Sequence, residues 1–210
     1  MRSSPLQPSL FSRAGGAPAD EARPRRLALD SGSWLELVPA WLADPEPLFA
    51  LLRSCLPWQQ HARRMFEKVV LEPRLTAELR DLARAPEPVR RAAERLSTQY
   101  GVEYDSVWLN LYRDGSDSTA WHRDWISCKR DECTVPVLTL GTPRRFLVKP
   151  RAGGASRSFR PEAGDLVVMG GRCQSDFVHA VPKEPGVSGP RISLNFQSSE
   201  QGIRTPPRRW

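Results

Sequence analysis

The sequence is poor in the residues that most often cross-link a fold or ligate a metal, with four cysteines and three histidines among 210 residues. The cysteines show no regular disulfide framework, and we predict that Cys128 and Cys133 are free thiols in a reducing cytoplasm. No apolar run is long enough to cross a bilayer, and no continuous apolar segment follows the positively charged start. We therefore expect neither a membrane span nor a secretory signal.

Acidic residues are also fewer than basic ones, and the formal net charge is +7. Residues 1–27 and 201–210 each carry +3, which leaves about +1 for residues 28–200. Composition therefore does not establish a basic face on the folded part. We expect one domain over residues 28–200 between two basic tails, the first disordered because its residues bury too little apolar surface.

Helical patterns dominate the first half of the predicted domain. Residues 34–38 predict a short strand. Residues 44–57 predict a helix, because Asp-Pro opens them and an apolar stripe follows. Residues 74–83 and 87–100 carry apolar residues at helical spacing, and we predict two further helices whose stripes face the core.

Short β segments fill the second half. Each is rich in β-branched, aromatic or alternating residues, and Gly- and Pro-containing turns separate them. Six such strands without intervening helices favour a closed or sandwiched antiparallel architecture, and we predict a mainly β jelly roll with helices packed on one face (α+β). The predicted strands are residues 107–112, 135–140, 145–148, 165–169, 177–181 and 192–196.

Two of the three histidines stand where a metal site would need them. His122 and Asp124 are two residues apart and so project from one face of a strand or of its end. His179 lies in an apolar strand that we expect on the far side of the barrel. Two imidazoles and one carboxylate form the facial triad of non-haem Fe(II) oxygenases, which leaves three coordination positions for a chelating co-substrate and O2. Arg191 is suited to clamp the far carboxylate of that co-substrate.

A His-x-Asp pair by itself is more often hydrogen-bonded than metal-bound. Longer motifs favour the metal, because their ordered series resembles the AlkB family of Fe(II)- and 2-oxoglutarate-dependent dioxygenases over about residues 55–197. These motifs are Asn-Leu-Tyr-Arg-Asp-Gly-Ser-Asp at 110–117, Trp-His-Arg-Asp at 121–124, Leu-Gly-Thr-Pro-Arg-Arg-Phe at 140–146, Gly-Asp-Leu-Val-Val-Met-Gly-Gly at 164–171, His-Ala-Val-Pro-Lys at 179–183, and Arg191.

The resemblance implies a double-stranded β-helix, or jelly-roll, core and a dioxygenase that uses Fe(II), 2-oxoglutarate and O2. Oxidation of an N-methyl group would then release formaldehyde, succinate and CO2. The period-two spacing of Asn110 and Tyr112 places both on one strand face, which must look into the barrel. The resemblance assigns His122, Asp124 and His179 to the iron and Asn110, Tyr112 and Arg191 to 2-oxoglutarate, and Ser193 can add a hydrogen bond.

The sequence departs from the family pattern at positions that bear on the co-substrate and the substrate. The family's Arg-x-Asn-x-Thr-x-Arg strand reads Arg-x-Ser-x-Asn-x-Gln from Arg191 to Gln197. Because Gln197 cannot supply a cation, we expect 2-oxoglutarate binding to be weaker or differently balanced. Trp125 replaces an acidic residue that reads the damaged base, and it either stacks on a flipped base or fills the core. Arg144 and Arg145 are candidate phosphate contacts or solvated charges.

The leading hypothesis is a monomeric oxidative demethylase that repairs N-alkylated bases in DNA or RNA. A second hypothesis keeps the iron chemistry but gives it a protein or small-molecule substrate. A third is a non-catalytic jelly-roll binding module. The sequence leaves open which alkylated base is the substrate, and whether it lies in DNA or RNA.

Overall fold

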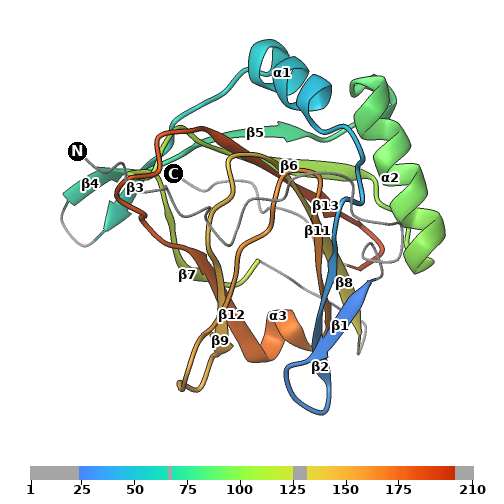
Figure 1. Ribbon diagram of the computed structural model, residues 1–210, viewed down its shortest axis with the longest axis vertical. Coiled ribbons are helices and arrows are strands. Elements are labelled where there is room, and N and C mark those ends of the chain that lie inside the picture. Colours follow the sequence, from blue (N-terminus) through green and yellow to red (C-terminus); the bar gives the residue numbers. More distant parts are fainter. Residues whose placement is uncertain (1–23, 66–67, 125–131, 202–210) are drawn as a thin grey trace, which may run out of the picture.

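The computed structural model describes residues 24–65, 68–124 and 132–201, which form a two-sheet β structure with two helices on one side (Figure 1). Among these residues, no helix is long and apolar enough to cross a membrane. The elements are β1 (Arg25–Ala28), β2 (Ser33–Val38), α1 (Glu46–Cys55), β3 (Ala62–Met65), β4 (Lys68–Leu71), β5 (Leu75–Leu79), η2 (Leu82–Arg84), α2 (Glu87–Tyr100), β6 (Ser106–Tyr112), β7 (Thr119–His122), β8 (Cys133–Gly141), β9 (Phe146–Pro150), β10 (Arg157–Phe159), β11 (Leu166–Gly171), α3 (Cys173–Asp176), β12 (Phe177–Val181) and β13 (Arg191–Gln197).

The strands form a large and a small antiparallel sheet. The large sheet has the order β1-β2-β11-β8-β13-β6-β5, and the small sheet has the order β10-β9-β12-β7. Strands β3 and β4 form a separate two-stranded hairpin. Non-consecutive neighbours such as β13 and β6 mean that the chain crosses repeatedly between the sheets, as the predicted jelly roll requires.

Two apolar clusters hold this arrangement together. The first lies between the large sheet and helices α1 and α2, where Leu52, Leu96 and Leu138 are fully buried. The second lies between the two sheets and contains Leu35 of β2 and Val148 of β9. Full burial of one such side chain stabilises the fold by about 1.5–3 kcal/mol, so these two layers fix the position of the sheets.

Strands β6 and β13 alternate strictly between the two sides of the large sheet. Val107, Leu109 and Leu111 of β6 belong to the cluster beneath the helices, as do the apolar residues of β13. The residues between them face the small sheet and line a pocket. Because successive side chains on a strand point to opposite faces, the same alternation places apolar residues in the core and polar residues in the pocket.

Helices α1 and α2 confirm the predicted helices at 44–57 and 87–100. In α2 the stripe of Val89, Ala92, Ala93 and Leu96 is buried. The helix ends at Gly101, whose φ of 64° is the left-handed conformation that glycine adopts without a Cβ clash, and whose N–H donates to the Ser97 carbonyl.

The predicted helix at 74–83 is wrong. Residues Leu75–Leu79 form strand β5, and only Leu82–Arg84 form a short 3-10 helix. Strand β5 pairs along its whole length with β6, Leu75 opposite Leu111 and Leu79 opposite Val107. Five residues are too few for helical periodicity to compete with these inter-strand hydrogen bonds.

Three smaller expectations also need correction. Strand β1 begins at Arg25, three residues before the expected domain start, because it pairs with β2. At the other end, Gln201 is buried and bonds the backbone of Thr134 rather than beginning a tail. Cys133 takes part in a disulfide, so the predicted free thiol is wrong there, and Cys128 lies outside the described residues.

Both expectations for Arg144, a phosphate contact or a solvated charge, are wrong, because its side chain is fully buried. The guanidinium donates to the carbonyl oxygens of Asp114, Asp117 and Pro182 at 2.6, 2.8 and 2.9 Å. Its Nε donates to the Glu184 carboxylate at 3.1 Å. Arg144 therefore ties the loop before β7 to the loop after β12.

Glu184 completes this Arg144 cluster from the second loop. Its carboxylate also accepts from the backbone N–H of Arg145 at 2.7 Å and from the Arg160 guanidinium at 2.7 Å. Gly115 packs so closely that a Cβ there would lie 2.0 Å from the Glu184 carbonyl oxygen. The cluster fixes the approach of strands β7 and β12 to each other.

We expect Arg144→Met to lower the free energy of unfolding by about 3–5 kcal/mol, because it leaves three carbonyl oxygens without this donor and removes the buried cation beside the Glu184 carboxylate. Arg145→Met is the matched control. The Arg145 side chain is 46% exposed, so we expect a loss of about 1 kcal/mol or less. Urea denaturation measures both variants, and equal losses would contradict the structural role of Arg144.

Candidate active site

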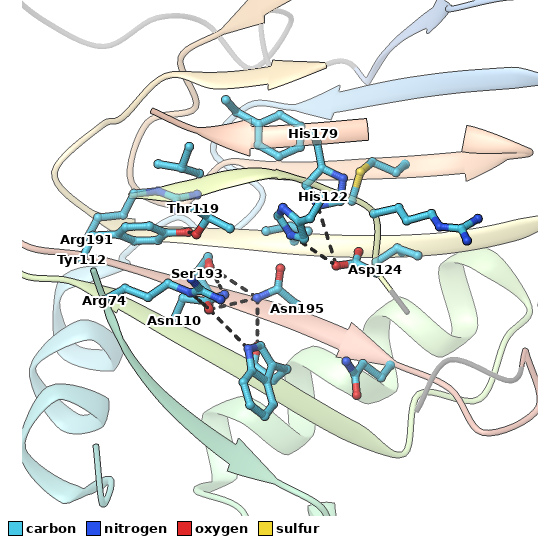
Figure 2. Close-up of a pocket in the computed structure, with 18 residues that line it drawn as sticks. Arg74, Asn110, Tyr112, Thr119, His122, Asp124, His179, Arg191, Ser193 and Asn195 are labelled. Atoms are coloured by element: carbon cyan, nitrogen blue, oxygen red, sulfur yellow. Dashed lines mark hydrogen bonds and ion pairs between the residues drawn. The ribbon is translucent and has the colours of Figure 1, made fainter. Parts of the chain in front are cut away.

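A cavity of about 180 Å³ lies between the two sheets and is lined by both (Figure 2). We call the side chains from β6 and β13 the pocket floor. Strands β7 and β12 supply the opposite wall. The floor consists of Trp108, Asn110, Tyr112, Arg191, Ser193, Asn195 and Gln197.

The two histidines of the predicted triad face each other across one strand pair. His122 of β7 is directly opposite His179 of β12, and their ring centres are 4.2 Å apart. The expectation that His179 comes from the far side of the barrel is therefore wrong, because β7 and β12 are neighbours in the small sheet. Opposed residues of an antiparallel pair share a face, and this register brings the rings together.

Asp124 follows β7 by two residues and completes the group. Its Oδ1 lies 3.8 Å from His122 Nε2 and 3.6 Å from His179 Nε2. All three donor groups lie within 4.8 Å of one another, so the predicted convergence of His122, Asp124 and His179 is confirmed.

Gln174 of α3 holds Asp124 by two hydrogen bonds. Its Nε2 donates to Asp124 Oδ2 at 3.0 Å, and its Oε1 accepts from the Asp124 backbone N–H at 3.1 Å. Gln174 is itself buried. The bond from Gln174 Nε2 occupies Oδ2 and leaves Oδ1, the oxygen near both histidines, turned toward them.

The ionisation of the triad suits a cation. The His122 Nδ1 lies 2.8 Å from the Ala120 carbonyl, which can only accept, so this nitrogen carries the proton and Nε2 keeps its lone pair. Desolvation, together with electrostatic repulsion from the nearby His179 ring, lowers the pKa of His122 to about 4. Burial acts to raise the pKa of Asp124, but the neighbouring histidines and Gln174 bring it below its usual value. At neutral pH, His122 is therefore neutral and Asp124 is ionised.

The pocket floor is built by the register of β6 and β13. Tyr112 is opposite Arg191, and Asn110 is opposite Ser193. Asn110 Nδ2 donates to Ser193 Oγ at 3.2 Å. All four side chains line the pocket, which confirms that Asn110 and Tyr112 share the face that looks into the barrel.

Arg191 is a buried cation whose hydrogen-bonding capacity is only partly used. Its Nη2 donates to Thr139 Oγ1 at 3.2 Å, and its guanidinium lies 5.3 Å from the centre of the Tyr112 ring. Among the described residues, none accepts a hydrogen bond from its Nε or Nη1. Burial lowers the pKa of Arg191 from its usual value. A buried cation with open donors costs free energy unless an anion fills the space beside it.

The remaining predicted residues lie elsewhere or outside the described part of the chain. Arg145 lies outside the pocket lining, and its guanidinium pairs with Glu184 at 3.3 Å. Trp125 lies outside the described residues. Sequence reasoning missed Gln174, Thr119 and Arg74, since the first two lie in segments without a distinctive pattern and the third was placed in a helix.

The comparisons with known proteins agree with this geometry. The family model described as "2OG-Fe(II) oxygenase superfamily" matches residues 50–197. The human "Alpha-ketoglutarate-dependent dioxygenase alkB homolog 3" is 28% identical over 194 residues, which cover 81% of this chain and 68% of that protein. The "DNA oxidative demethylase ALKBH2" of Arabidopsis thaliana is 26% identical and covers 86% of this chain and 72% of its own length.

Solved structures with the same fold include an oxidoreductase of the 2OG-Fe(II) oxygenase family from Burkholderia pseudomallei, with a TM-score of 0.55, 20% identity, and coverage of 80% of this chain and 87% of that one. OsALKBH1 has a TM-score of 0.57 at 15% identity and covers 83% of this chain and 100% of its own. Both likenesses confirm the jelly-roll core. Because the family model covers most of the chain and its relatives are AlkB homologues, this protein belongs to the 2OG-Fe(II) oxygenase superfamily and is an AlkB-like dioxygenase.

Proposed function

We propose that this protein is an oxidative demethylase that removes alkyl groups from the nitrogens of bases in DNA or RNA. The observation that carries the proposal is a single pocket with the His122, Asp124 and His179 group in one wall and the partly unpaired Arg191 in its floor. The relatives support the substrate class, since one of them is named a DNA oxidative demethylase.

His122, Asp124 and His179 are the residues that would hold the iron. Members of this family use Fe(II), 2-oxoglutarate and O2. Two imidazole nitrogens and one carboxylate oxygen match the donor set of non-haem Fe(II) oxygenases. The Gln174 bonds to Asp124 keep Oδ1 free for the metal, and the Ala120 carbonyl keeps His122 in the tautomer that presents Nε2.

Arg191 would bind the far carboxylate of 2-oxoglutarate. Its Nε and Nη1 have no acceptor among the described residues, so each can donate a charge-assisted hydrogen bond to that carboxylate. The Tyr112 hydroxyl lies beside this position and exchanges a hydrogen bond of 2.9 Å with Thr119 Oγ1. Asn110 and Ser193 are the next pair along the floor and offer neutral hydrogen bonds to the rest of the co-substrate.

When bound, iron, 2-oxoglutarate and O2 together supply the oxidation of a substrate C–H bond, with release of succinate and CO2. The residues of the chain then have three tasks: to orient the co-substrate from Arg191, to hold the donor atoms, and to exclude water from between the sheets. Hydroxylation of an N-methyl carbon gives a hemiaminal that breaks down to formaldehyde and the free amine of the base.

The demethylase activity is tested by incubating the full chain with Fe(II), 2-oxoglutarate and oligonucleotides that carry N-methyladenine or N-methylcytosine. We expect equal amounts of succinate and formaldehyde and a loss of the methyl mass from the oligonucleotide. His122→Ala should abolish all three, because it removes a metal donor. Turnover of 2-oxoglutarate that a peptide or metabolite stimulates, and methylated oligonucleotides do not, would overturn the nucleic-acid substrate.

The role of Gln174 is tested by metal affinity rather than activity. We expect Gln174→Ala to weaken Mn(II) binding by about 10–100-fold, because residues that orient a metal ligand typically have effects of this size. Asp176→Asn is the matched control, since Asp176 lies in the same short helix but pairs with Arg172 at the surface. Calorimetric titration measures both. Equal Mn(II) affinity of the two variants would show that Asp124 is held without Gln174.

A further inference from the structure

Arg74 brings a second positive charge to the pocket floor, from a part of the chain remote from β13. It directly precedes β5 and lines the pocket. Its side chain is 16% exposed. The last floor residue of β13, Gln197, is uncharged. Strand β13 therefore supplies one cation, Arg191, and Arg74 supplies another from outside that strand.

Two of the three guanidinium nitrogens of Arg74 are held in place. Nε donates to Asn110 Oδ1 at 2.9 Å, and Nη2 lies 3.3 Å from the Glu72 carboxylate. A guanidinium fixed at two points keeps its planar fork oriented before any ligand arrives.

The bond to Arg74 also fixes the Asn110 amide. Asn110 Oδ1 accepts from Arg74 Nε and from Trp108 Nε1, at 2.9 and 3.3 Å. The amide nitrogen therefore points the other way, to Ser193 Oγ at 3.2 Å. Without Arg74, one of the hydrogen bonds that determine which way the Asn110 amide is turned would be lost.

The order of residues along the floor places Arg74 near the metal ligands rather than near the far carboxylate. Tyr112 and Arg191 form one pair, and Asn110 and Ser193 form the next. Thr119, at the start of β7, contacts Tyr112, and His122 lies three residues further along that strand. In Figure 2 the guanidinium of Arg74 lies among Asn110, Ser193 and Asn195.

We propose that Arg74 is a positioning residue for the co-substrate: it orients Asn110 and supplies positive charge at the 2-oxo acid end, whereas Arg191 serves the far carboxylate. This inference rests on the proposed function, since it assumes that 2-oxoglutarate spans the floor from Arg191 to the triad. Arg74 gives the co-substrate a second cation, although β13 carries only Arg191.

The test compares two acids that share the 2-oxo acid end. One is 2-oxoglutarate, and the other is 2-oxopentanoate, which lacks the far carboxylate. Binding of each to the full-length, Mn(II)-loaded protein is measured by calorimetry without O2. We expect Arg74→Met to weaken both acids by a similar factor of about tenfold or more, because a charge-assisted contact to their shared end is lost. Arg191→Met should weaken only 2-oxoglutarate.

Two further variants separate positioning from folding. Arg74→Lys keeps the charge but loses the Nε–H that orients Asn110, so its affinity should lie between those of the unchanged protein and Arg74→Met. Arg80→Met is the matched control, because Arg80 follows β5 and its side chain is 74% exposed. We expect it to bind both acids as the unchanged protein does. Mn(II) affinity without either acid should stay within about threefold in every variant.

The possible failures are distinguishable. If Arg74→Met leaves both affinities unchanged, or weakens 2-oxoglutarate alone, the assignment of Arg74 to the 2-oxo acid end is overturned while the proposed function stands. If the unchanged protein loaded with Mn(II) binds no 2-oxoglutarate, the proposed function is overturned, and the role of Arg74 with it.

Discussion

The pairing of β6 with β13 is the constraint on which both the core and the pocket depend. Each strand turns its apolar residues toward the helices and its polar residues toward the small sheet. A shift of either strand by one residue would place Arg191 against the helices and leucines in the pocket. The free energy gained by burying Leu109, Ile192 and Leu194 therefore also holds Tyr112 opposite Arg191.

Two buried arginines show how hydrogen bonding separates a structural cation from a functional one. Arg144 and Arg191 are both almost inaccessible to solvent. Arg144 has acceptors from two loops and a carboxylate, so its charge is compensated within the fold. Arg191 keeps two donors without an acceptor among the described residues. Burial alone does not separate them, and the unmatched donors of Arg191 are what indicate an anionic ligand.

The large features of the fold could be predicted from local sequence. The stripe at positions 89, 92, 93 and 96 predicted α2 because burial on one helical face needs that period. The helix predicted at 74–83 is wrong because local sequence does not decide the conformation there. Strand β5 is only five residues long, and its conformation is set by hydrogen bonds to β6. Its apolar residues fit a helix locally, and only the partner strand decides between the two structures.

The sequence by itself determined which chemical groups the protein has for its site: two histidines and an aspartate in recognisable motifs, and an arginine in the last strand. The tertiary structure alone decided that His122 and His179 are neighbours in one sheet. It also decided that Gln174 holds Asp124, that Arg144 is internal, and that Arg74 reaches Asn110. These contacts join residues 27 to 57 positions apart. Local periodicity carries no information about which distant strands and loops will pair, and the packing of the two sheets settles it.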